Sequence, residues 1–78
     1  MILRKTIAER ILSAYTEGRG YTWKDSNGTI WAFDHDRDIY CQGQCNTVRL
    51  GQIELMTDGD TSLNIEIANG PTLQYEVR

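Results

Sequence analysis

The feature that most constrains the fold is an alternation of apolar and polar side chains along the C-terminal third of the chain. Its inward positions are Leu63, Ile65, Ile67, Leu73, Tyr75 and Val77. Side chains point to opposite faces of a strand in turn, so this period predicts two strands with one packed face and one wet face. A three-residue loop at residues 68–70 puts all six apolar residues on the same face.

The requirement that apolar side chains share one face also predicts the register of a hairpin closer to the N-terminus. A loop of three residues at 26–28 sets Trp23 opposite Trp31 and Tyr21 opposite Phe33, so that all four rings share one face. A two-residue loop would divide the rings between the faces. The longer loop also suits a type I turn with a bulge whose glycine is left-handed.

A third hairpin is predicted around residues 58–60. This loop aligns Leu55 with Leu63 and Ile53 with Ile65.

One stretch breaks the alternation. Val48 and Leu50 are out of step with the apolar positions that follow them, and Gly51 lies between the two phases. Glycine favours bulges and bends inside strands, so we expect the strand to bulge at Gly51.

The N-terminal segment has helical rather than strand periodicity. An apolar stripe recurs at Leu3, Ile7, Ile11, Ala14 and Tyr15. It predicts an amphipathic helix over 3–17, ended by Gly18. Thr6 and Glu9 also fit a capping box, which would start the helix later.

Together these elements predict an α+β fold. The helix packs on one face of a twisted antiparallel meander of about five to six short strands. We expect the strands at 20–25, 29–34, 38–42, 47–57, 61–67 and 72–77, in a single domain over 1–78.

Length and charge restrict the classes of function. A chain of 78 residues builds one small core with little room for a deep cleft. The formal net charge of -3 divides into +3 over residues 1–24 and -6 over 25–78. The sequence contains no apolar run long enough to span a membrane and no secretory pattern, so we expect a cytoplasmic protein that uses no membrane.

Residues 33–45, FDHDRDIYCQGQC, concentrate the reactive side chains. Asp34, Asp36 and Asp38 match the opening of a calcium loop, but Ile39 and Cys45 stand where that loop needs glycine and glutamate. Aspartate favours turns and keeps them solvated. The aspartates are therefore interpreted as an acidic turn whose carboxylates can take part in binding a partner.

A zinc site at His35, Cys41 and Cys45 is the alternative for this segment. Its soft ligands suit zinc, but the C-x3-C spacing is weakly diagnostic and no second Cys or His pair follows. A buried cysteine is also a small hydrophobe, and Cys41 is in phase with the core. We expect inert thiols and no cofactor, with zinc or a tight disulfide as the alternatives.

A stacking platform for nucleic acid is the second alternative, built on Tyr21, Trp23, Trp31 and Phe33. The helix needs an apolar floor, and these rings supply the largest one. We therefore favour the interpretation that the rings belong to the core. The negative net charge of the chain would also repel a phosphate polymer. Direct binding of nucleic acid is therefore not the first expectation.

The outward positions of the C-terminal strands are mostly polar. They include Glu54, Glu66 and Glu76, with Asp58 and Asp60 at the adjoining turn. Such a face is either a solvated surface or a docking surface for a basic groove.

No set of nucleophile, base and oxyanion donors can be assembled from the sequence, so we expect a non-enzymatic protein. The expected function is binding of another protein as an inhibitor or regulator, through the acidic surface. In build the chain resembles the small inhibitors that phages and mobile elements make against nucleic-acid machinery, such as anti-CRISPR proteins. The resemblance lies in size and charge and covers no motif. The acidic face can dock on the basic groove of a partner, including a groove that normally holds nucleic acid.

Overall fold

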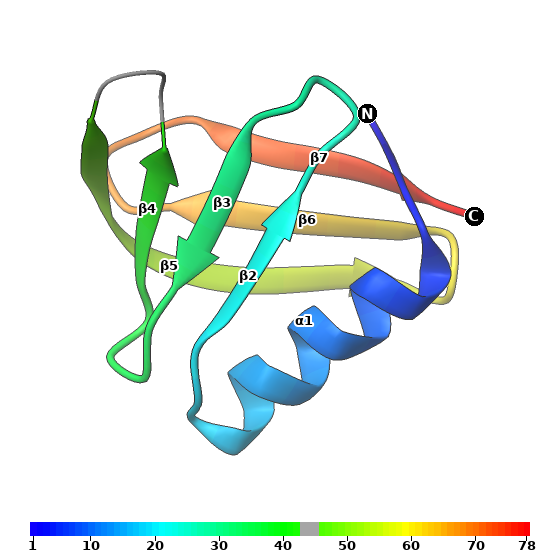
Figure 1. Cartoon of the computed structure of the whole chain (residues 1–78). Coiled ribbons are helices and arrows are strands. Elements are labelled where there is room, and N and C mark those ends of the chain that lie inside the picture. The colour runs from blue at the N-terminus through cyan, green and yellow to red at the C-terminus, as the bar shows by residue number, and fades with distance from the viewer. Residues whose placement is uncertain (43–45) are drawn as a thin grey trace.

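The computed structural model describes residues 1–42 and 46–78 and has the predicted α+β architecture (Figure 1). One helix, α1 (Lys5–Glu17), follows a short strand, β1 (Ile2–Leu3). The remaining strands are β2 (Tyr21–Lys24), β3 (Ile30–Phe33), β4 (Asp38–Gln42), β5 (Thr47–Asp58), β6 (Ser62–Ile67) and β7 (Thr72–Val77). The six strand ranges predicted after the helix agree with β2–β7 to within one residue at each end.

The strands form one curled half-barrel in the order β1-β7-β6-β5-β4-β3-β2. The expected count of five to six strands was too low, because the described sheet has seven. The additional strand is β1, which pairs in parallel with β7, whereas the other pairings are antiparallel. Leu3, predicted to be helical, lies in β1. Two residues are too short to show a period, and the apolar side chain of Leu3 also fits the helical stripe.

The helix consequently begins at Lys5, with Arg4 as its N-cap. No side-chain cap forms, so the capping box predicted at Thr6 and Glu9 is wrong. The predicted end is confirmed. Gly18 takes the left-handed conformation at φ 71° and its N–H donates to the carbonyl of Tyr15.

The aromatic hairpin has the predicted register. Trp23 lies opposite Trp31 and Tyr21 opposite Phe33. Gly28 has a φ of 82°, the left-handed conformation that a bulged three-residue loop requires. The β6–β7 hairpin is confirmed as well, since the register places its apolar residues on one face.

The β5–β6 hairpin differs from its prediction. Leu55 lies opposite Ile65 and Ile53 opposite Ile67, which moves the register by two residues. The loop is residues 59–61, because Asp58 pairs with Ser62. A shift of two residues returns every side chain to the same face, so parity alone could not detect it.

Gly51 forms the predicted bulge. Ile39 pairs with Gly51 and Tyr40 with Arg49, so Leu50 is the extra residue on β5. Gly51 has a φ of 125°, which other residues adopt only with strain. The bulge reverses the phase of β5, so that Ile53 is buried after it and Leu50, at the bulge, packs partly against the core, whereas Val48 stays exposed.

A single core fills the curl. The buried apolar residues are Leu3, Ala8, Ile11, Ala14, Trp23, Trp31, Phe33, Ile39, Ile53, Leu63, Ile65, Ile67, Leu73 and Tyr75. Figure 1 shows α1 running along the concave side of the sheet, between β2 and the β5–β6 turn. The helix therefore covers the core on the concave side of the sheet.

Candidate functional site

The candidate site is the outer face, which we define as the outward-pointing side chains of β5, β6 and β7. Cross-strand pairing arranges these side chains in three rows. The first row is Glu54, Glu66 and Thr72; the second is Met56, Asn64 and Gln74; the third is Asp58, Ser62 and Glu76. The structure thus brings four of the predicted acidic residues together on one surface.

The first row holds two carboxylates side by side. Glu54 lies directly opposite Glu66, and both side chains are exposed. No ion pair reaches either glutamate from any residue that the structure describes. Directly opposed like charges destabilise an antiparallel pair. This row therefore carries an uncompensated repulsion in the protein alone.

The third row is partly neutralised. Arg78 donates to the carboxylate of Glu76 at 2.8 Å and 3.0 Å. Asp58 and the predicted site residue Asp60, in the β5–β6 turn, are both exposed. The middle row separates the two acidic rows and includes Met56, whose exposure is 49%. The outer face is thus an anionic surface with one exposed apolar side chain, Met56, on β5 between Glu54 and Asp58.

The acidic turn between β3 and β4 is organised by Asp34. One carboxylate oxygen accepts the backbone N–H groups of Asp36 and Asp38, and the other accepts the hydroxyl of Tyr40. Desolvation, the largest single influence, raises the pKa of Asp34, but these hydrogen bonds together hold that pKa below its ordinary value. Asp34 therefore stabilises the turn and has few lone pairs left for a partner.

Asp38 is engaged in a similar way, because Arg49 on β5 donates to its carboxylate at 2.7 Å. The hydrogen bond with Asp38 is also the main reason why the pKa of Arg49 is raised. Asp36 is exposed and lies 3.5 Å from the Nε2 atom of His35. Of the three aspartates predicted to bind a partner, only Asp36 keeps its carboxylate turned to solvent.

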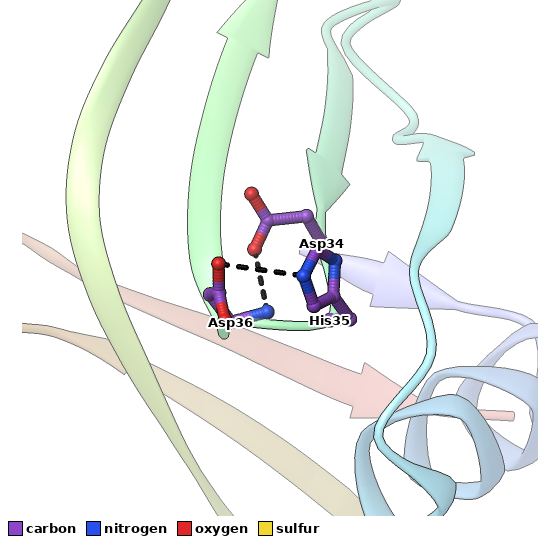
Figure 2. A group of neighbouring side chains, drawn as sticks. All are labelled: Asp34, His35 and Asp36. Carbon is purple, nitrogen blue, oxygen red and sulfur yellow. Dashed lines mark hydrogen bonds and ion pairs between the residues drawn. The ribbon is translucent and has the colours of Figure 1, made fainter.

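The side chains of Asp34, His35 and Asp36 lie close together (Figure 2), and their potential ligand atoms are within 4.8 Å of one another. His35 and Asp36 are exposed, and the carboxylate of Asp34 is already hydrogen-bonded within its turn. Exposed acidic turns commonly have this geometry. The group offers a weak cation site at most.

The zinc prediction cannot be assembled from the described residues. Cys41 is half-buried on β4, opposite Trp31 and packed against the core, as its phase predicted. His35 is exposed in the turn before β4 and groups with the aspartates rather than with Cys41. Cys45, the third proposed ligand, lies outside the described residues. The disulfide alternative depends on the same residue and stays a prediction.

The aromatic residues proposed as a stacking platform are mainly core. Trp23, Trp31 and Phe33 are buried, and Tyr21 is half-buried at the edge of the sheet. Both indole N–H groups are satisfied internally: that of Trp23 by Tyr75, and that of Trp31 by Asp25. Buried rings cannot stack on bases, so Trp23, Trp31 and Phe33 do not form the proposed stacking platform.

Asp25 is a structural residue that sequence reasoning missed. Among the described residues it is the buried charged one, 8% exposed. Its carboxylate accepts the backbone N–H groups of Asn27 and Thr29 and the indole N–H of Trp31. In the sequence, Asp25 precedes a turn that contains Asn-Gly, so it is interpreted simply as a turn residue. Its hydrogen bond with Trp31 depends on the fold and has no sequence signal.

No family model, curated protein or solved structure matches this chain. Within the described residues, no helix is both long and apolar enough to span a membrane. The fold and the outer face define a small α+β half-barrel domain with an acidic exterior.

Proposed function

We propose that this protein is a non-enzymatic binding domain that docks its outer face on a basic surface of another protein, and so acts as an inhibitor or regulator. One observation carries the proposal: Glu54 and Glu66 are neighbouring, exposed and without a cationic partner among the described residues. A partner that supplies lysine or arginine would relieve this repulsion.

The dimensions of the outer face suit a groove rather than a single residue. The two acidic rows contain residues four positions apart on β5, which is about 13 Å along a strand. Both rows can therefore contact cations spaced along a groove, while Met56 lies between them. A groove that normally holds nucleic acid presents several lysine and arginine side chains to the phosphate backbone. The chain would then occupy such a groove in place of that backbone.

Charge complementarity of this kind affects the association rate and selects partners more than it adds affinity. We therefore expect association that weakens steeply with added salt. We also place this action in the cytoplasm.

The test has two steps. Affinity capture with this protein as bait isolates and identifies the partner, and the association rate of the two purified proteins is then measured directly. Glu54→Lys combined with Glu66→Lys should reduce the association rate by at least about tenfold at low salt, by reversing two charges. Asp34→Asn is the matched control, since that carboxylate is engaged in its own turn. Unchanged association of the double variant would reject the outer face as the docking surface.

A further inference from the structure

The curled sheet is left open on one side, between β1 and β2. These two strands are the edges of the sheet, and they are not hydrogen-bonded to each other. A groove lies between them, lined mainly by Ile2, Arg4, Ile7, Tyr21, Trp23 and Lys24. At one end Asn27 contacts the sulfur of Met1 at 3.7 Å, and at the other the start of α1 closes the groove. We call this groove the wedge.

The backbone of β2 offers unused hydrogen-bonding groups to the wedge. The N–H of Asp25 donates to the carbonyl of Thr29, which fixes the alternation along the β2–β3 ladder. Trp23 and Tyr21 then bond to β3, and the N–H and C=O groups of Thr22 and Lys24 point away from it. Among the strands that the structure describes, none runs along this side of β2 (Figure 1).

The opposite wall of the wedge has the same character. The carbonyl of Met1 accepts a hydrogen bond from Glu76 on β7, and that of Leu3 accepts one from Arg78 just after β7, so the backbone groups of Ile2 point away from β7. The Ile2 side chain is 49% exposed. Two strand edges with unpaired backbone groups therefore face each other across an apolar floor.

The charge of the wedge is opposite to that of the outer face. Arg4 and Lys24 are exposed at its two walls, and neither forms an ion pair with a residue that the structure describes. Asp25 is the acidic residue in the lining, and its carboxylate already accepts three hydrogen bonds from within the protein. The free charge of the wedge is therefore positive.

We propose that the wedge binds an extended acidic segment of a partner protein, which adds to the free edge of β2 as an extra strand. Strand addition supplies main-chain hydrogen bonds, and the flanking side chains supply selectivity. Arg4 and Lys24 select carboxylates, and Ile2, Ile7 and Tyr21 contact the inward side chains. β2 is four residues long, about 13 Å, so the segment pairs over three or four residues.

A second copy of this chain is a less suitable occupant. Pairing of β2 with β2 brings two Lys24 side chains and two Arg4 side chains together at one interface. Facing like charges are destabilising. The positive wedge therefore favours an acidic segment over self-association.

The experiment uses the whole isotope-labelled chain and a blocked seven-residue probe peptide in which glutamate alternates with valine and threonine. We expect the acidic peptide to slow hydrogen exchange at the amides of Thr22 and Lys24. The same peptide with lysine in place of glutamate should leave them unchanged. Titration is followed by NMR at low salt.

Two variants separate pairing from charge. Thr22→Pro removes an outward N–H at an edge position that tolerates proline, and it should abolish binding of the acidic peptide. Lys24→Glu should weaken that binding about fivefold, the effect of losing one exposed ion pair. Lys5→Glu is the matched control, because Lys5 borders a different hollow beside the β5–β6 turn. Circular dichroism checks that each variant is folded.

Three outcomes would overturn the proposal. They are no protection of Thr22 and Lys24 by the acidic peptide, equal protection by the lysine peptide or a single-stranded oligonucleotide, or protection that rises with protein concentration alone. The outer face is tested separately, since Glu54→Lys with Glu66→Lys should leave peptide binding at the wedge intact.

Discussion

The indole N–H of Trp23 on β2 donates to the hydroxyl of Tyr75 on β7, at 3.1 Å in the buried core. β2 is one edge of the sheet, and β7 lies next to the other edge. This hydrogen bond therefore joins the two ends of the curl across its interior. It also holds β2 in the position that leaves its outer edge facing the wedge.

Tyr75→Phe should lower the free energy of unfolding by about 1–3 kcal/mol, because it leaves the buried indole N–H of Trp23 without an acceptor. Urea unfolding followed by tryptophan fluorescence measures the change. Tyr40→Phe is the control: it removes a hydroxyl whose hydrogen bond to Asp34 is only partly buried. A loss no greater than that of the control would show that the Trp23–Tyr75 bond has no structural role.

Asp25→Ala should lower the free energy of unfolding by about 3 kcal/mol or more. Three N–H donors lose their carboxylate acceptor, and one of them is the buried indole of Trp31. Thermal unfolding gives the comparison. Asp58→Ala, an exposed acidic position, should change stability by no more than about 0.5 kcal/mol. Equal melting temperatures for the two variants would contradict the assigned role of Asp25.

Asp34 should make stability depend on acid pH. The pKa of Asp34 is lower in the folded protein than in the unfolded chain, so its contribution is complete above the unfolded pKa, near 4. That contribution is lost as the pH falls through the folded pKa. Asp34→Asn should therefore be less stable than the native protein at neutral pH, and the difference should vanish in strong acid. Urea titrations at several pH values test this.

Gly20→Ala should destabilise the protein by contact with the backbone rather than by strain in φ. A Cβ atom at this position would lie 2.8 Å from the carbonyl oxygen of Phe33, and backbone cannot move aside cheaply. Gly59→Ala is the matched control, since its Cβ would meet nothing within 4 Å but Gly59 has a φ of 57°. The free energy of unfolding should fall by about 1 kcal/mol in the control and by more in Gly20→Ala, as measured by chemical denaturation. The reverse order would contradict the packing of Gly20 against β3.

The opposed carboxylates of Glu54 and Glu66 should make the outer face a source of instability. Glu66→Lys alone turns a repulsive cross-strand pair into an attractive one and should raise the unfolding free energy by about 0.5–1 kcal/mol. Glu66→Gln should raise it by less, because it removes repulsion without adding attraction. The gain should shrink in high salt. A loss of stability on Glu66→Lys would mean that the two carboxylates do not repel in the folded state.

Much of the fold follows from the alternation of apolar and polar residues in the sequence. The requirement that four aromatic rings share one face predicted the Trp23–Trp31 register, and the interruption of the alternation in β5 predicted the bulge at Gly51. The same reasoning is blind to a slip of two residues, which is how the β5–β6 loop was misplaced. Thr61 closes that turn through its hydroxyl and N–H, both donated to the carbonyl of Asp58. This local bond has no periodic signature.

The candidate site was predictable in the same measure. Alternation placed Glu54, Glu66 and Glu76 on the wet face, where the structure has them. It could not show that Arg78 pairs with Glu76 or that Arg49 pairs with Asp38, because those contacts depend on side-chain conformation. The wedge was unpredictable too, since it exists only because the two-residue strand β1 adds to β7 and not to β2.

The bulged strand β5 has a consequence for cooperativity. It bonds to β4 along its first half and to β6 along its second, and no other strand in residues 1–42 and 46–78 bridges these two parts of the sheet. Neither part can detach without exposing the other's share of the common interior. The amides of β5 should therefore open only when the whole molecule unfolds, which makes this strand the slowest to exchange with deuterated solvent.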